Sequence, residues 1–192
     1  MTKKIVCGLP EEIKSHICTL KKASKDTTNN LYMCESNITV IDFDKMPNEY
    51  SRGKGWNAVP SSNDALYVDE KKWYFIEFKN GGIKKNDIYK KAYDSVIMLL
   101  DWKIFSNIEF VRKNVEYILV YNKSKQELDS LALSHHYDYL ERLSQEEEQL
   151  FDVDKLQGFL FLATHTYTKE LFQKKFIALK EQEEGENAYT LQ

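Results

Sequence analysis

The alternation of apolar and polar residues in the middle of the chain predicts four β-strands. Residues 37–42 (Asn-Ile-Thr-Val-Ile-Asp) are rich in β-branched side chains, which favour extended structure. Residues 64–68 and 73–80 are two further apolar segments, separated by four polar residues and followed by glycines at 81–82. The apolar run 115–121 is the fourth. The central two segments are expected to form a β-hairpin.

Apolar residues at helical spacing predict helices on either side of these strands. Residues 9–24 carry Ile13, Ile17 and Leu20 on one stripe. Residues 84 to about 105 repeat the pattern over a longer stretch. Both segments are expected to flank the sheet, each with one apolar face.

The remaining segments complete the predicted architecture. Residues 46–62 contain prolines, glycines and serines and are predicted to form a long loop. Residues 125–149 are expected to be mostly helical, and the apolar segment 156–163 to be a strand. Thr168 suits the N-cap of a final helix that ends at about residue 180. The expected fold class is α/β, with a mixed central sheet flanked by helices and a C-terminal helical addition.

The composition is typical of one globular domain, expected to span residues 1–180 and to precede an acidic, disordered tail at 181–192. The 192 residues include 7 glycines and 3 prolines, and no stretch resembles a linker or a repeat. The 3 cysteines are irregularly spaced, which fits neither a disulfide framework nor a zinc site. Because no signal peptide or membrane-spanning run is found, a cytoplasmic protein without a membrane partner is expected.

The predicted hairpin brings two carboxylates together. With a symmetrical turn between Glu70 and Lys71, Asp64 lies directly opposite Glu77, with Cβ atoms about 5 Å apart. Lys79 lies two residues after Glu77 and therefore shares its face of the sheet. Like charges at opposed positions destabilise a sheet unless another group compensates them.

The flanking residues indicate that both faces of the hairpin are buried. Leu66 and Phe75 lie on the carboxylate face, and the other face is also apolar. A buried carboxylate pair needs compensation, which a divalent cation between the two groups supplies. Hard oxygen ligands at this separation suit Mg²⁺ or Mn²⁺. The pattern therefore predicts a metal site at Asp64 and Glu77.

Other interpretations of these acidic residues stay open. Glu77 and Lys79 can form an ordinary ion pair on the surface of a structural protein. A bulge in the hairpin would move Asp64 to the opposite face. Asp42 and Asp44 end the first predicted strand, as an alternative acidic site or as ordinary strand-end residues.

The residues of this hairpin resemble a known motif. Asn63-Asp64, the hairpin and Ile76-Glu77-Phe78-Lys79 are similar to the PD-(D/E)xK motif of restriction-endonuclease-like nucleases. The predicted order of elements from Leu9 to Tyr121 resembles that family's core of a helix, three strands, a helix and a strand. This resemblance covers somewhat over half of the chain. Asn63 stands where the motif has its name-giving proline, which is often absent in the family.

The resemblance implies a role for each matching residue. Asp64 and Glu77 would ligate the metal, and the backbone carbonyl of Phe78 would be a further ligand. Lys79 would position or activate the attacking water and stabilise the charge that develops on the phosphate. In some members an acidic residue on the first helix completes the site. The candidates for that residue are Glu11 and Glu12.

Basic residues concentrate in the middle of the chain, although the net charge of −3 argues against strong non-specific binding to nucleic acid. Four lysines begin the helix after the hairpin and are predicted to contact a phosphate backbone; the alternative is an ordinary solvated helix face. Trp56 is a candidate for stacking on a base, or else packs its loop down. The four lysines are Lys84, Lys85, Lys90 and Lys91.

These observations predict a metal-dependent nuclease that uses Mg²⁺ or Mn²⁺. Its partner would be nucleic acid, with DNA favoured over RNA. The alternative is a non-catalytic interaction, immunity or regulatory protein on the same fold. A homodimer or another protein partner is compatible with either interpretation.

Overall fold

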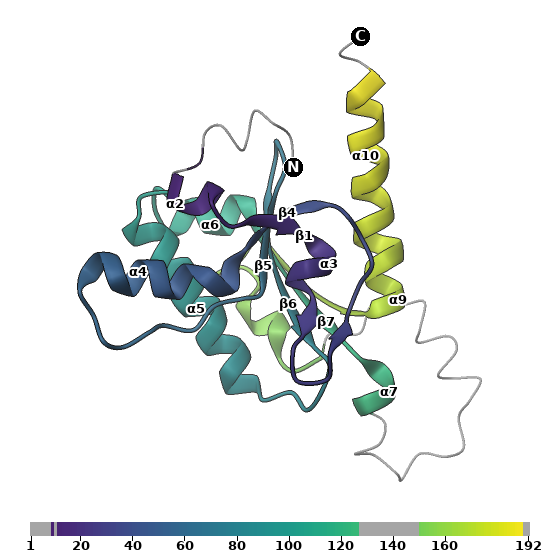
Figure 1. The fold of residues 1–192 in the computed structure, drawn as a ribbon, viewed down its shortest axis with the longest axis horizontal. Helices are drawn as coiled ribbons and strands as arrows, with labels where there is room; N and C mark the ends of the chain where they lie inside the picture. The colour runs from purple at the N-terminus through teal and green to yellow at the C-terminus, as the bar shows by residue number, and fades with distance from the viewer. Residues whose placement is uncertain (1–8, 10, 127–149, 190–192) are drawn as a thin grey trace.

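A six-stranded mixed β-sheet is the centre of the computed structural model, which describes residues 9, 11–126 and 150–189 (Figure 1). The β1, β4, β5 and β6 strands are antiparallel neighbours, whereas β6, β7 and β8 run parallel. Helices cover both faces, which confirms the predicted mixed α/β architecture. In spatial order the strands are β1 (Ile17–Thr19), β4 (Thr39–Asp42), β5 (Ala65–Val68), β6 (Trp73–Lys79), β7 (Val115–Tyr121) and β8 (Ala163–Thr168).

Short helices and one long helix connect the strands. A second small sheet pairs β2 (Lys25–Asp26) with β3 (Leu31–Tyr32). The α-helices are α2 (Glu11–Lys14), α3 (Leu20–Ala23), α4 (Met46–Lys54), α5 (Lys85–Asp101), α6 (Ile108–Asn114), α7 (Lys123–Gln126), α9 (Lys169–Phe172) and α10 (Ala178–Tyr189). Other helical turns are η1 (Phe43–Lys45), η3 (Val153–Leu156) and the π-helical η4 (Gln173–Ile177).

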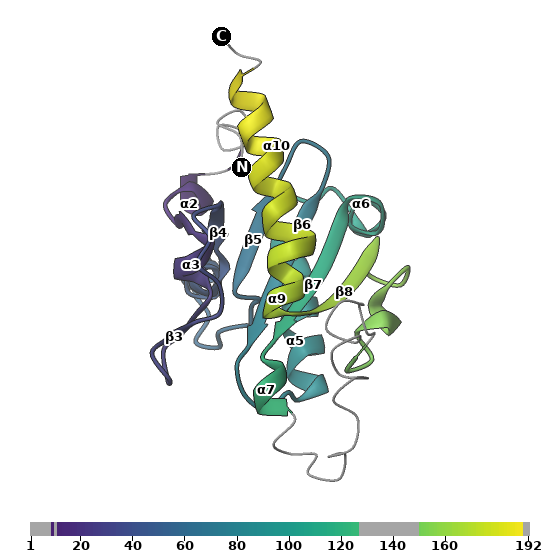
Figure 2. The ribbon, with the colours of Figure 1, turned by 90° about the vertical axis from the view of Figure 1, so that its right-hand side faces the viewer.

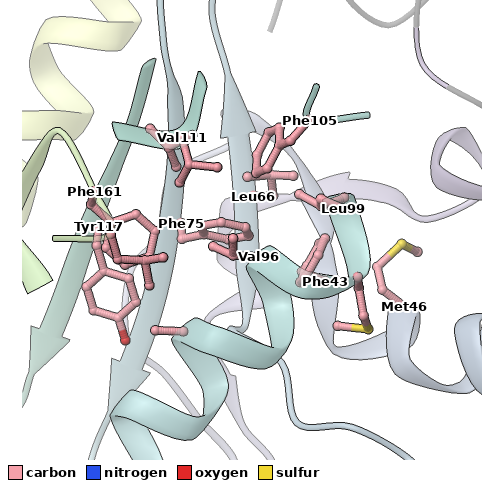
Figure 3. Close-up of a cluster of buried hydrophobic side chains, with 14 of the residues drawn as sticks. Phe43, Met46, Leu66, Phe75, Val96, Leu99, Phe105, Val111, Tyr117 and Phe161 are labelled. Atoms are coloured by element: carbon pink, nitrogen blue, oxygen red, sulfur yellow. The ribbon is translucent and has the colours of Figure 1, made fainter. Parts of the chain in front are cut away.

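The sheet separates two apolar cores. The first lies on the side of α4 and α5, where Phe43, Phe75 and Phe105 make edge-to-face contacts (Figure 3). The second lies under α9 and α10, which cross the opposite face of the sheet (Figure 2). There Phe172 stacks on Phe176. Each fully buried aromatic ring contributes about 2 kcal/mol of apolar transfer free energy, which holds the sheet firmly between its helices.

The β5–β6 hairpin has the predicted register. Val68 pairs with Trp73 and Ala65 with Ile76, as a symmetrical turn requires. The turn is held by Asp69, whose Oδ1 accepts hydrogen bonds from the backbone N–H groups of Lys71 and Lys72 at 2.8 and 2.7 Å. Asp64 directly precedes the paired residues, and the same register extended by one residue places it opposite Glu77 at the open end of the hairpin.

The predicted helix at residues 9–24 is wrong. The segment forms α2, then the edge strand β1, then α3, whose N-cap is Thr19. Ile13 packs in the first core and Leu20 in the second, on opposite faces of the sheet. One straight helix could not bury both residues, so pairing of β1 with β4 overrides the helical spacing.

Two other predicted elements are also wrong. Residues 46–62 were expected to be a loop but begin with α4, in which Pro47 occupies the first turn and Gly55, at a φ of 67°, ends the helix. The apolar run 156–163 was expected to be a strand, but the strand β8 starts only at Ala163. Before it, Leu156, Leu160 and Phe161 are buried because η3 and the following turn insert them into the first core, whereas Phe159 is exposed.

The C-terminal region combines a confirmed prediction with a difference. Thr168 caps α9, with its hydroxyl accepting a hydrogen bond from the backbone N–H of Leu171 at 3.2 Å. The predicted disordered tail from residue 181 is instead helical as far as Tyr189, because Glu, Gln and Ala are good helix formers. The predicted helix 125–149 falls largely outside the described residues. No helix in the described part of the chain is long and apolar enough to cross a bilayer.

Candidate functional site

The candidate site lies at the open end of the β5–β6 hairpin, on the face covered by α5. Asp64 directly precedes β5, and its Oδ2 accepts a hydrogen bond of 2.6 Å from the backbone N–H of Phe78. The Asp64 side chain thus crosses to β6 and stands next to Glu77 and Lys79. The structure brings together the three residues that the motif predicted.

Glu77 is the centre of this cluster. Its side chain is 0% exposed, although it is ionisable. Its Oε1 lies 2.8 Å from the Nζ of Lys79 and 2.7 Å from the Nζ of Lys91, on α5. The same Lys91 ammonium lies 3.1 Å from Oδ1 of Asp64. Two carboxylates and two lysines therefore form one compact, nearly neutral group, and the ion pair of Glu77 with Lys79 is not at the surface.

The pKa values in the cluster reflect its burial. Loss of water and then repulsion by Asp64 raise the pKa of Glu77 to about 7, despite the two lysines. Burial opposes the charge of Lys91, but the carboxylates of Asp64 and Glu77 outweigh it and raise the pKa of that lysine. Lys91 therefore stays charged, and the loss of water shows itself in the raised pKa of Glu77.

Several polar atoms around Glu77 lack partners. Among the described residues, Oε2 of Glu77 has no hydrogen bond or ion pair. The hydroxyl of Tyr117 and both side-chain atoms of Asn63 are likewise buried without a hydrogen bond in the described structure. Each such atom costs about 1–3 kcal/mol, so an unsatisfied cluster of this kind points to a polar ligand.

A pocket of about 190 Å³ reaches the residues around the buried Glu77. Its wall includes Asp64, Phe78, Lys79 and Lys91 on one side and the β2–β3 hairpin on the other. Its volume and polar lining suit a hydrated ion or a small anionic group. The opening is therefore where a ligand would reach the carboxylates.

Asp44 lines the same pocket, although the sequence suggested only a separate acidic site with Asp42. The surrounding protein and then the charge of Asp64 raise the pKa of Asp44 to about 6. Asp42 instead pairs with Lys45 at 2.6 Å. The signal for Asp44 was its position just after the strand that pairs with β5, which brings it beside Asp64.

The donor set fits a hard divalent cation once Lys91 is displaced. Asp64 and Glu77 offer carboxylate oxygens, and Oε2 of Glu77 is free of other partners in the described residues. As the side chains stand, no group of three His, Cys, Asp or Glu residues in the described chain is arranged to hold a metal. The Lys91 ammonium lies where it compensates both carboxylates, and its side chain, 22% exposed, lines the pocket.

The lysines predicted to contact nucleic acid do not form one surface. Lys91 lies inside the site, Lys85 pairs with Asp152, and Lys90 pairs with Asp94 at 2.5 Å. Lys84 is exposed at the start of α5. Of the four lysines, two therefore have acidic partners and one belongs to the buried cluster.

The remaining predicted residues lie apart from the carboxylates. Glu11 is exposed and pairs with Lys14 at 2.8 Å, so it does not complete the site. The side chain of Glu12 lies outside the described part of the structure. Trp56 is 55% exposed and lines a second pocket next to α4.

Comparisons with protein-family models, with curated proteins and with solved structures found no match. The likeness to a nuclease motif therefore depends on the residues and geometry described above.

Proposed function

We propose that this chain is a metal-dependent nuclease with a restriction-endonuclease-like core and with Asp64, Glu77 and Lys79 as its catalytic residues. The observation that carries the proposal is Glu77, a fully buried carboxylate beside a second one, with one oxygen unpartnered in the described structure and a pocket lined by its neighbours Asp64, Lys79 and Lys91. Structural carboxylates are normally exposed or fully paired, because burying an uncompensated charge is costly.

Each residue of the candidate site has its own role in this proposal. Asp64 and Glu77 hold Mg²⁺ or Mn²⁺, with the backbone carbonyl of Phe78 as a further ligand, and Lys91 turns away from its place between them. The metal supplies an acidified water and offsets the charge of a phosphodiester. Lys79, 2.8 Å from Glu77, presents a compact positive charge that orients the attacking water or stabilises the phosphate.

The second candidate is a non-catalytic interaction or regulatory protein on the same fold. The position of Lys91 favours it, because an ammonium 2.7 and 3.1 Å from the two carboxylates already compensates them. A permanent lysine in this place would make the metal unnecessary and would leave the cluster as a structural group. The two candidates therefore differ in whether a metal displaces Lys91.

Cleavage assays test the nuclease proposal directly. Plasmid DNA, single-stranded DNA and RNA are incubated with the full chain and Mg²⁺ or Mn²⁺, with EDTA as the metal-free control. The variants are Glu77→Ala and Lys79→Ala, and Lys180→Met serves as a control for loss of a buried lysine elsewhere. Cleavage that needs metal and is lost in the two site variants alone supports the proposal. Folded protein that cleaves none of the substrates favours the non-catalytic alternative.

A further inference from the structure

A second, open pocket of about 460 Å³ lies beside α4. Two exposed apolar side chains line it, Trp56 at 55% and Val59 at 53% exposure. Lys45, which pairs with Asp42, and Arg52, which pairs with Glu49, bring cationic groups to its edge, and the other polar lining residues are His16, Asn48 and Ser51. An aromatic wall with a basic rim matches the chemistry of a nucleotide, in which a flat base is joined to a phosphate.

The loop holds Trp56 in a fixed position. The backbone N–H of Trp56 donates to the carbonyl of Ser51 at 2.9 Å, and the Ser51 hydroxyl donates to the carbonyl of Ala58 at 3.0 Å. The Trp56 ring makes an edge contact with Tyr50, with 5.6 Å between centroids and an angle of 82°. Packing the loop down would bury the indole, whereas here more than half of it is exposed. The indole is therefore presented to solvent in advance of binding.

Charged groups in this pocket form an ordered network. Glu49 pairs with Arg52 at 2.9 Å and lies 3.8 Å from the Nε2 of His16. The carboxylate of Glu49 can accept from a base amino group, whereas Lys45 and Arg52 suit a phosphate. The pocket therefore offers both stacking and polar contacts to one nucleotide.

Consecutive residues of η1 line the two pockets. Asp44 lines the carboxylate pocket and the next residue, Lys45, lines the Trp56 pocket, so the short turn η1 separates them. A single strand that crosses this turn would carry a phosphate at the pocket of Asp64 and a base at the pocket of Trp56. A base can stack on a protein side chain in this way only after it leaves its own duplex stack.

We infer that the Trp56 pocket binds an unpaired nucleobase next to the scissile phosphate, which makes single-stranded nucleic acid the substrate class. This inference rests on the proposed nuclease function for its place in catalysis. The binding itself depends only on the Trp56 pocket.

Binding of labelled oligonucleotides tests the inference. Fluorescence anisotropy in EDTA measures the Kd of the full chain for a mixed-sequence single strand and for the duplex of the same length. We expect Trp56→Ala to weaken single-strand binding about tenfold, in line with the loss of one stacked base. The matched control is Phe159→Ala, which removes another aromatic side chain, 60% exposed, and should leave the Kd unchanged. Thermal unfolding checks that both variants fold.

The outcomes separate this inference from the proposed function. Equal single-strand binding by wild type and Trp56→Ala overturns the inference, as does duplex binding at least as tight as single-strand binding. Metal-dependent cleavage of duplex DNA by Trp56→Ala at the wild-type rate would leave the nuclease proposal intact and remove the inference. Binding of single strands through Trp56 without any cleavage would retain the pocket and remove the nuclease proposal.

Discussion

Both ends of the β5–β6 hairpin combine carboxylates with lysines, but the carboxylate is fully paired at one end and only partly paired at the other. At the turn, Asp69 accepts from two backbone N–H groups and from the Nζ of Lys180 at 2.7 Å. At the open end, Glu77 faces two lysines and a second carboxylate, and its Oε2 has no partner in the described structure. Burial acts on both carboxyl groups, yet the pKa of Asp69 is lowered whereas that of Glu77 is raised to about 7.

This difference distinguishes a structural ion pair from a site. Lys180 joins the turn to α10 and also lies over the rings of Tyr67 and Tyr74, so every charge there has a packing role. Glu77 has two lysines at Oε1, but its Oε2 accepts no hydrogen bond in the described residues. A carboxylate that folding leaves incompletely paired is available to a ligand, and we expect substitutions at the two ends to have opposite effects on activity and on stability.

The largest expected effect comes from neutralising one carboxylate at each end. Glu77→Gln keeps the shape of the side chain but should lower metal-dependent cleavage at least about 100-fold, since even residues behind a metal ligand contribute 10–100-fold. Asp69→Asn should leave cleavage within about twofold and lower the free energy of unfolding by about 1–3 kcal/mol. Initial cleavage rates and urea unfolding measure the two quantities. A loss of activity in both variants would contradict the distinction.

The next effect concerns the two lysines. Lys91→Met and Lys180→Met should each lower the free energy of unfolding by about 3 kcal/mol in EDTA, because each removes a lysine that pairs with a carboxylate in the protein interior. Excess Mn²⁺ should restore about 2–3 kcal/mol in Lys91→Met alone, through binding to the folded state. Thermal unfolding with and without Mn²⁺ measures this. If Mn²⁺ has no effect on Lys91→Met, the non-catalytic alternative gains support.

The smallest effect is a pH dependence of the turn. Burial raises the pKa of Asp69 but its hydrogen bonds from Lys180 and the turn N–H groups lower it further, and Asp69 in return raises the pKa of Lys180. The stability from Asp69 is therefore present above its unfolded pKa of 3.8 and is lost as pH falls below that value. The Lys180 contribution is lost only above its unfolded pKa of 10.5.

The stability difference between wild type and Asp69→Asn should shrink by about 1 kcal/mol between pH 7 and pH 3. A constant difference over this range would show that the carboxylate charge is unimportant.

Local signals predicted the hairpin and its cluster from the sequence. A polar four-residue turn between two apolar strands has one symmetrical register, which placed Asp64 opposite Glu77. The strand β7 was predicted with its observed bounds because its residues are buried on both faces. These elements depend on neighbouring residues, so no long-range information was needed.

The role of Lys91 was missed although a signal was present. Lys91 lies three residues after Ile88 and four before Ser95, both buried, and therefore falls in the buried stripe of α5. When Lys91 is grouped with the other three lysines as surface charge, its place in the buried stripe is overlooked. The strand β1 and the helix α4 were missed for another reason, because each is fixed by tertiary pairing or by end caps that outweigh the local pattern.

Asn80 ties one wall of the pocket to the sheet through hydrogen bonds. Its amide donates to Asp26, on the β2–β3 hairpin, at 2.6 Å and accepts from the amide of Asn122 at 2.8 Å, while Ser124 donates to Asn122. These hydrogen bonds all point the same way, from Ser124 through Asn122 and Asn80 to Asp26. Asn80 therefore connects the sheet to the β2–β3 hairpin, which forms one wall of the pocket. Asn80→Asp would replace the amide that donates to Asp26 by a second carboxylate, which would repel the first. A change of this one side chain would therefore loosen the β2–β3 wall of the pocket while leaving Asp64, Glu77 and Lys79 unchanged.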